Sequence, residues 1–277
     1  MHCARNTPPY IFGGHGYILP VEQEGPMTER QIFALTGADR QNFLQGLVSN
    51  DLSRLAQGPV YTALLTPQGK YLADFFVIDG GDRLLVDVAA PLGAGLMQRL
   101  SMYKLRADVQ ISATDLGVVR GTPEVSGPAP EGALPDPRHP ALGWRLYGPA
   151  AELPAADATD WEALRVAHTI PETGIELIPN DSYILEMGFE RLHGVDFRKG
   201  CYVGQEVTAR MKHKTELKKG LATLAIEGTA PLGTEITAEG KVVGTLYTQA
   251  GGQALAYLRQ DRVAPQMQAG EATLSPL

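Results

Sequence analysis

Cysteine is scarce in this sequence, where Cys3 and Cys201 are the two examples among 277 residues. Two thiols so far apart provide neither a disulfide framework nor a Cys-x-x-Cys metal site. The six histidines show no His-Glu-x-x-His or other ligand spacing, so we expect no metal site. Because free thiols are typical of reducing compartments, we expect a cytoplasmic protein.

Positive charge and long apolar runs are also lacking. The chain has 24 Lys and Arg against 31 Asp and Glu, which gives a net charge of −7. Such a chain does not coat nucleic acid or an anionic membrane by charge alone. No run reaches the roughly 18 apolar residues of a membrane-spanning helix, and the N-terminal residues lack the pattern of a secretory signal. We therefore expect a protein that binds neither nucleic acid nor a membrane directly. Separately, we expect it to be a monomer.

Glycine and proline, in contrast, are abundant, with 31 and 20 residues. Their excess over average usage implies many turns and favours a β-rich or mixed architecture over a helical bundle. The length suggests two domains at roughly 150 residues each.

Hydrophobic spacing predicts helices and strands in mixed order. We expect helices over 39–48, 92–103, 161–169 and 204–211. We expect strands over 31–35, 60–66, 71–79, 83–89 and 108–113, and a continuous loop over the proline-rich stretch 121–140. Short strands separated by glycine-containing turns then follow over 221–226, 235–238, 242–248 and 254–258. This last pattern is typical of a small barrel or sandwich.

The same pattern suggests three parts. Residues 1–26 show no periodicity, and we expect either an extended, disordered arm or a leader upstream of a true start at Met27. Residues 27–212 form an α/β region whose two lobes join near 114–141, and residues 213–277 form the small β-barrel.

The densest chemical signal is the stretch around the second cysteine, Arg198-Lys199-Gly200-Cys201-Tyr202-Val203-Gly204-Gln205-Glu206. Cations beside a thiol and a helix N-terminus after it favour the thiolate, which is the reactive form. The glycines allow a ligand to approach the backbone closely. A free cysteine is also commonly buried and inert, so a reactive and a structural Cys201 stay equally open at this point.

Basic residues cluster around this motif in an otherwise acidic chain. They are Arg198, Lys199, Arg210, Lys212, Lys214, Lys218 and Lys219. The cluster predicts either a site for an anionic ligand or a solvated helix face. Asp74 lies between apolar neighbours in a predicted strand, where it faces either solvent or a pocket, and the solvated position is favoured two to one.

The stretch Lys199-Gly200-Cys201-Tyr202-Val203-Gly204-Gln205-Glu206 resembles the K-G-C-[YF]-x-G-Q-E signature of the YgfZ-type folate-binding proteins. Supporting matches come earlier in the chain: Asp39-Arg40 with Phe43-Leu44-Gln45-Gly46, then Thr66-Pro67-Gln68-Gly69-Lys70 with Asp74, and Asp136-Pro137-Arg138 with Leu142-Gly143-Trp144-Arg145. The resemblance covers about residues 32 to 224.

That family is similar in fold to the glycine cleavage T-protein, a tetrahydrofolate-dependent aminomethyltransferase. The resemblance therefore implies an α+β fold, with two α/β lobes of antiparallel sheets and helices and a C-terminal β-barrel around a central cavity. It implies a tetrahydrofolate-binding factor for the maturation or repair of iron–sulfur proteins, including a tRNA-modifying methylthiotransferase. Folate and iron–sulfur client proteins would be its partners.

The resemblance also implies site residues. Cys201 would be the functional thiol, and the residues near folate would be Asp74, Lys199, Gly200, Tyr202, Gly204, Gln205, Glu206 and Arg210. Two alternatives stay open: a folate-dependent aminomethyl or one-carbon transferase, and a binding module in which Cys201 is structural. The chain lacks the Thr-Gly-Glu motif of the T-protein and has Ala73-Asp74 where that enzyme has two aspartates. An assembly factor is therefore favoured over an enzyme.

Overall fold

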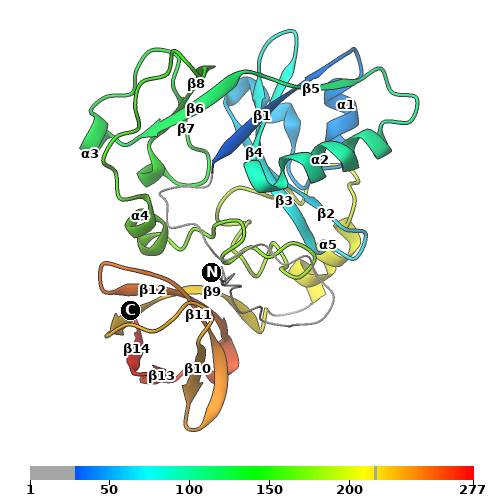
Figure 1. Ribbon diagram of the computed structural model, residues 1–277. Coiled ribbons are helices and arrows are strands. Elements are labelled where there is room, and N and C mark those ends of the chain that lie inside the picture. Colours follow the sequence, from blue (N-terminus) through cyan, green and yellow to red (C-terminus); the bar gives the residue numbers. More distant parts are fainter. Residues whose placement is uncertain (1–28, 215–216) are drawn as a thin grey trace, which may run out of the picture.

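The computed structural model describes residues 29–214 and 217–277. It contains two α/β lobes above a barrel (Figure 1). The expectations for residues 1–26 lie outside the described residues. No helix in the described ranges is long and apolar enough to cross a membrane.

The first lobe is a five-stranded antiparallel sheet in the order β2-β3-β4-β1-β5. Its strands are β1 Arg30–Thr36, β2 Val60–Leu65, β3 Tyr71–Asp79, β4 Leu84–Ala89 and β5 Gln110–Ala113. The helical elements are α1 Arg40–Gln45, the 3-10 turn η1 Leu52–Gln57 and α2 Ala90–Tyr103.

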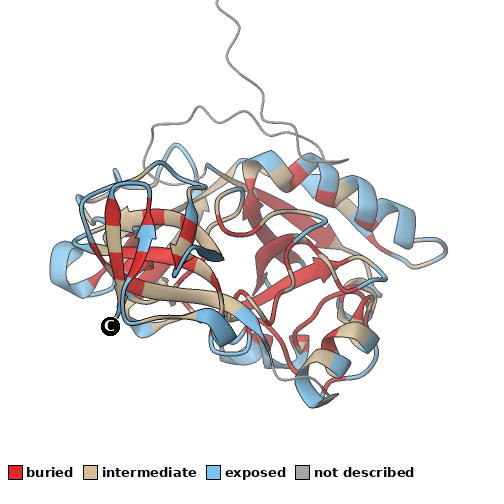
Figure 2. Ribbon diagram, turned by 90° about the horizontal axis from the view of Figure 1, so that it is seen from below, coloured by how far each residue is buried: buried red, intermediate tan, exposed pale blue. Residues whose placement is uncertain are grey.

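Both faces of this sheet are buried, which explains why its strands read as nearly continuous apolar runs. Alternate residues point to opposite faces of a strand. In β3, Phe75 and Val77 join the core beneath α2, whereas Phe76 and Ile78 join the core shared with the second lobe. Figure 2 shows the buried residues following the strands, while the outer turns of the helices are exposed.

The second lobe corrects the expectation of a plain loop over 121–140. A three-stranded sheet, β6-β8-β7, runs through it with β6 Leu116–Gly121, β7 Leu134–Pro135 and β8 Trp144–Pro149. The one-turn helix α3 Pro123–Ser126 and the 3-10 turn η2 Pro140–Leu142 lie within the same stretch. Prolines fit here because they occupy first helical turns and an edge strand, where no backbone N–H is needed.

Helix α4 Trp161–Ala167 follows, and a long series of turns then returns to the first lobe and leads into α5 Gln205–Lys214. The turns are anchored by buried apolar side chains such as Ile170, Leu177 and Phe189, which join the core between the lobes.

The C-terminal part is a closed barrel in the order β10-β11-β12-β9-β14-β13. Its strands are β9 Lys219–Glu227, β10 Glu235–Ala238, β11 Lys241–Ala250, β12 Gln253–Arg259, β13 Met267–Ala269 and β14 Ala272–Pro276, with the 3-10 turn η3 Gln260–Arg262. The sequence pattern missed β13 and β14, because alanines at buried positions (Ala269 and Ala272) give only a weak apolar signal. The predicted α+β class with a C-terminal barrel is confirmed.

Candidate functional site

Cys201 lies on the turn that leads into α5, and its side chain is exposed. The alternative of a cysteine buried in a tight turn is therefore wrong. Its neighbours differ sharply, because Lys199 and Tyr202 are buried while Gly200 is exposed. The loop therefore exposes the Cys201 thiol, while the nearby side chains of Lys199 and Tyr202 are buried.

Lys199 fixes this loop to the first lobe. Its ammonium donates to the carbonyl oxygens of Gln45 at 2.6 Å, Val48 at 2.5 Å and Asn50 at 3.1 Å. Burial lowers the pKa of Lys199 to about 8, while the carboxylates of Asp51 and Asp196 act in the opposite direction. With three carbonyl partners, this side chain holds the turn in place.

Asp196 ties the start of the same loop. One carboxylate oxygen accepts the backbone N–H of Arg198 at 2.6 Å and of Lys199 at 3.2 Å, and the other pairs with Arg54. The backbone N–H of Asp196 donates to the carbonyl of Ser49 at 3.0 Å. The cysteine loop is therefore held at both the side-chain and the backbone level.

Two motifs that are far apart in the sequence meet at the start of α5. Gly204 has φ of +84°, and a Cβ there would lie 2.6 Å from the carbonyl oxygen of Thr66. Gly69, with φ of +75°, faces it, and a Cβ there would lie 2.8 Å from the Cβ of Val207. Glycine is required at both positions, since side chains would be strained and would collide. The turn between β2 and β3 thus supports the cysteine loop.

The other residues predicted near folate belong to this loop and helix. The Tyr202 ring lies 5.1 Å from the Lys199 ammonium, and burial raises the pKa of its hydroxyl to about 12. Gln205 and Glu206 begin α5, and Arg210 is exposed further along it. These loop and helix residues line neither of the two cavities described below. Of all the residues predicted near folate, Asp74 alone lines one of those cavities.

Asp74 is buried at 6% exposure, so the favoured interpretation of a solvated aspartate is wrong. Its carboxylate accepts hydrogen bonds from the hydroxyls of Tyr71 at 2.7 Å, Tyr61 at 3.0 Å and Thr173 at 2.6 Å. Burial and then the charge of Asp74 raise the pKa of both tyrosines well above the usual value. The tyrosines therefore stay protonated and act as donors.

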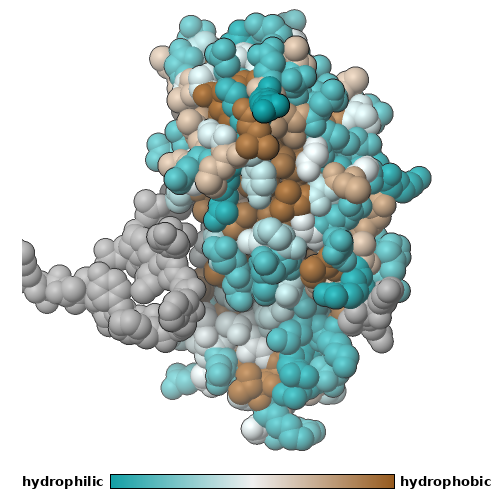
Figure 3. All heavy atoms as spheres, turned by 90° about the vertical axis from the view of Figure 1, so that its right-hand side faces the viewer, coloured by the Kyte–Doolittle hydropathy of each residue, from teal (hydrophilic) through white to brown (hydrophobic). Residues whose placement is uncertain are grey.

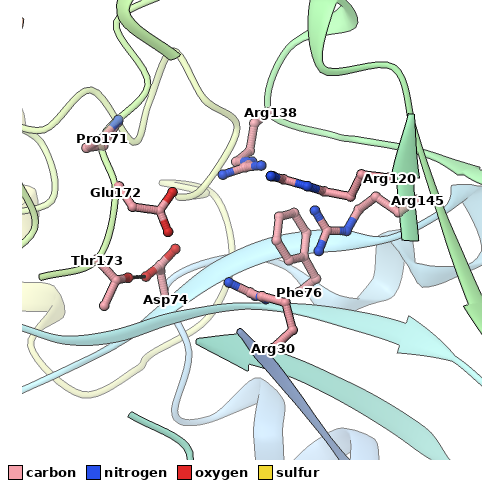
Figure 4. Close-up of a pocket in the computed structure, with 9 residues that line it drawn as sticks. All are labelled: Arg30, Asp74, Phe76, Arg120, Arg138, Arg145, Pro171, Glu172 and Thr173. Carbon is pink, nitrogen blue, oxygen red and sulfur yellow. Dashed lines mark hydrogen bonds between the residues drawn. The ribbon is translucent and has the colours of Figure 1, made fainter. Parts of the chain in front are cut away.

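Asp74 lines a small cavity between the two sheets, which we call the interlobe cavity. Its volume is about 10 Å³, and its other lining residues are Arg30, Phe76, Arg120, Arg138, Arg145, Pro171, Glu172 and Thr173. Figure 4 shows the carboxylates of Asp74 and Glu172 on one side and four guanidinium groups on the other.

Three of these arginines are held by two buried aspartates. Arg30 donates to Asp87 at 2.7 Å, and Arg145 reaches both Asp87 at 2.6 Å and Asp136 at 3.2 Å. Arg138 pairs with Asp136 at 2.8 Å. Burial alone would raise the pKa of Asp136, but Arg138 and Arg145 hold it well below its usual value.

Sequence reasoning missed this arginine cluster. The residues Asp136, Arg138 and Arg145 supported the family resemblance but were not interpreted as buried charges. A usable signal was present, because Arg120 and Arg145 interrupt the apolar strands β6 and β8.

A second, larger cavity of about 380 Å³ lies where the 176–187 turns, α5 and the barrel meet, and we call it the barrel-side cavity. Its rings are Tyr183, Tyr247 and Tyr257, its cations are Lys70, Lys218 and Lys219, and its acidic groups are Glu176, Asp181 and Glu186. Lys70 lies over the Tyr183 ring at 3.8 Å, and the Tyr257 hydroxyl donates to Glu186 at 2.6 Å. The basic residues clustered around the cysteine motif therefore lie in different environments. Lys199 is buried, while Lys218 and Lys219 are exposed beside this cavity.

Comparison with known proteins identifies the family of this chain. Residues 218–277 match the model of the CAF17 C-terminal β-barrel domain. The mitochondrial iron–sulfur cluster assembly factor IBA57 of Mus musculus is 30% identical over 277 aligned positions, covering 84% of this chain and 76% of that protein. The chain belongs to the IBA57 family.

A second IBA57 homologue, the mitochondrial protein of Mycosarcoma maydis, is 34% identical over 230 residues. That alignment covers 73% of this chain but 57% of the fungal protein, so the chain spans little more than half the length of that relative. The crystal structure of the glycine cleavage aminomethyltransferase of Bartonella henselae superposes with a TM-score of 0.70 at 12% identity, covering 90% of this chain and 83% of that one. This likeness shows the T-protein fold.

The names of these IBA57 proteins contradict the cytoplasmic location expected from the scarce cysteines, because both are called mitochondrial. The inference failed for a physical reason: free thiols indicate a reducing compartment but do not distinguish one such compartment from another.

Proposed function

We propose that this protein matures or repairs iron–sulfur proteins and that Cys201 is its working thiol. The observation that carries the proposal is an exposed thiol on a turn fixed by Lys199, Asp196 and Gly204. Cysteine thiolates are the usual ligands of iron–sulfur clusters. The family relatives are named iron–sulfur cluster assembly factors. A rigidly placed, accessible thiol suits contact with a cluster or with a thiol of a client protein.

The test is complementation of a strain that lacks its own copy, scored by the activities of its iron–sulfur enzymes. We expect wild type to restore them and Cys201→Ala to fail while it melts at the wild-type temperature. Gly200→Ala is a matched control in the same turn, because a Cβ there meets no atom within 4 Å. Full rescue by Cys201→Ala would reduce Cys201 to a structural residue of a binding module.

The proposal also includes tetrahydrofolate as a ligand, and the two cavities differ in how well they could hold it. The interlobe cavity, at about 10 Å³, has room for little more than one water molecule, so a pterin ring does not fit. The barrel-side cavity, at about 380 Å³, lies within the usual range for small-molecule sites. Its tyrosines suit stacking, its acidic groups can accept pterin N–H donors, and its lysines suit glutamate carboxylates. Tetrahydrofolate is therefore proposed there rather than beside Asp74.

Calorimetry with tetrahydrofolate mono- and polyglutamates tests this site. Extra glutamates should tighten binding at low salt, and the gain should fade as salt screens exposed charges beyond roughly 10 Å at 0.1 M. The double variant Lys218→Gln, Lys219→Gln should lose that gain, whereas Lys241→Gln in the barrel should keep it. Equal affinity for both forms at low salt would contradict the proposal.

A one-carbon transferase remains the second candidate, because the chain shares the T-protein fold. The assay is one-carbon transfer to a lipoyl-carrier protein in the presence of tetrahydrofolate. Turnover that disappears in Asp74→Asn would support the enzyme. We expect no turnover, because three hydroxyls already occupy the Asp74 carboxylate.

A further inference from the structure

Arg120 differs from the other arginines of the interlobe cavity. It lies in β6 with 9% of its surface exposed, and its guanidinium carbon is 4.0 Å from the centre of the Trp161 ring. Within residues 29–214 and 217–277, its Nε is a buried donor without a hydrogen-bond partner. Arg30, Arg138 and Arg145, in contrast, each donate to a buried aspartate.

The surroundings of Arg120 disfavour its positive charge. Burial lowers its pKa to about 9, and the neighbouring cations Arg145 and Arg138 act in the same direction. Glu172 and Asp136 act in the opposite direction, but they do not compensate. A buried cation that is repelled by its neighbours and has an unused donor is stabilised by an anion.

The direction of the side chain agrees with this requirement. Figure 4 shows the Arg120 guanidinium reaching into the interlobe cavity beside that of Arg138. The carboxylates of Asp74 and Glu172 stand on the opposite side, and Asp74 is compensated by three hydroxyl donors. The arginine side of the cavity is therefore electropositive and lies next to the free donor.

We propose that the interlobe cavity is a binding site for a small oxyanion, a carboxylate or a phosphate, which accepts a hydrogen bond from Arg120. The existing space of about 10 Å³, which Arg120 lines, has room for about one oxygen atom of that anion. Room for the remainder of the anion requires Arg120 to shift, because Arg30, Arg138 and Arg145 are held by Asp87 and Asp136. The site goes beyond the proposed function, since it involves neither Cys201 nor the barrel-side cavity.

Tryptophan fluorescence reports directly on this site. The chain has two tryptophans, Trp144 and Trp161, and Arg120 stacks on Trp161. In a Trp144→Phe background, sodium phosphate and sodium succinate are titrated against sodium chloride at matched ionic strength. A saturable change with phosphate or with succinate supports the site and tells an inorganic oxyanion from a carboxylate. A response to neither, or the same response to chloride, overturns the proposal.

Two variants test whether the fluorescence response to anions depends on Arg120. Arg120→Met removes a buried cation without removing a hydrogen bond of Nε, so the melting temperature in chloride buffer should be kept or raised. Its apparent affinity for the anion should fall about tenfold or more, because a charge-assisted hydrogen bond is lost. Arg259→Met is the matched control, since the Nε of Arg259 is also buried without a partner but belongs to the barrel.

The control should keep the full anion response, and an unchanged response in Arg120→Met would overturn the proposal. If Arg120→Met fails to fold, Arg120→Lys serves instead, because it keeps the charge and loses the Nε donor. It should also weaken anion binding, and wild-type affinity in that variant would equally refute the site. Rescue of iron–sulfur enzymes by the Cys201 variants is scored separately, so failure of one proposal does not imply failure of the other.

Discussion

At the residue scale, the cysteine loop shows how a charged side chain can serve as a structural clamp. Lys199 stands two residues from Cys201 and looks like a ligand-binding cation in the sequence. In the fold its ammonium is buried against three carbonyl oxygens. Removing the lysine takes away the donor that these three oxygens share, which makes this position sensitive to mutation.

Lys199→Met should therefore lower the free energy of unfolding by about 2 kcal/mol or more, because buried carbonyls lose their donor. Urea denaturation measures the change. Lys212→Met is the control: Lys212 is exposed and pairs with Glu190, so its replacement should cost within about 0.5 kcal/mol. Equal effects of the two variants would show that Lys199 does not clamp the loop.

A second prediction at this scale concerns pH. His139 and His168 stack at 4.2 Å, and burial, followed by the charge of His168, lowers the pKa of His139. The unfolded chain therefore binds a proton at His139 more readily than the folded protein does. The stabilising contribution of neutral His139 is present above the pKa of the unfolded state, about 6.5, and is lost as pH falls below that value.

Replacing His139 by Gln should flatten the decline in unfolding free energy between pH 7 and pH 5. Urea denaturation of both proteins at a series of pH values provides the comparison. Parallel pH profiles for wild type and variant would contradict the assignment.

At the element scale, the junction of the β2–β3 turn with α5 determines where the thiol stands. Gly204 is in the left-handed region, where a side chain costs roughly 1–2 kcal/mol, and a Cβ there would collide with the Thr66 carbonyl. Gly204→Ala should lower the unfolding free energy by about 2–4 kcal/mol. Gly200→Ala, four residues earlier and in open space, should cost within about 0.5 kcal/mol. Urea midpoints that coincide for the two variants would refute this account.

Much at the element scale could be predicted from the sequence. The meander around β3 and the barrel strands β9 to β12 follow from alternation and turns, and Cys201 stands out through its glycines and cations. The arginine cluster could not be predicted the same way. Arg120 and Arg145 are buried because a second sheet covers the first, and that packing depends on residues far apart in the chain. Asp74 was misjudged for the same reason, since Tyr61 and Thr173 reach it from other segments.

At the scale of the whole molecule, a buried hydrogen-bond network joins α4 and the turns after it to the barrel. Glu176 is 1% exposed and accepts from Arg165 of α4 at 3.2 Å and from the Thr248 hydroxyl of β11 at 2.6 Å. Arg165 also donates to the Thr248 hydroxyl at 3.2 Å. The three side chains form a single network, so removal of the carboxylate affects both bodies.

Glu176→Ala should cost about 3–5 kcal/mol, because it leaves a buried arginine without its nearest counter-charge. Calorimetry should then show the barrel and the lobes unfolding in separate transitions. Glu186→Ala, which removes the bond to the Tyr257 hydroxyl at the same junction, should cost nearer 1 kcal/mol and keep one transition. A single sharp transition in Glu176→Ala would argue that other contacts couple the two bodies.

The closure of the barrel has a consequence for the solubility of the protein. Each of its six strands has a neighbour on both sides, because β10 pairs with β13 and β14 pairs with β9. Unpaired strand edges are templates for association with other chains, and a closed ring removes them. The strand β14, Ala272–Pro276, completes that ring between β13 and β9. Loss of β14 would therefore free the edges of β9 and β13 and turn a self-contained ring into a surface on which copies aggregate.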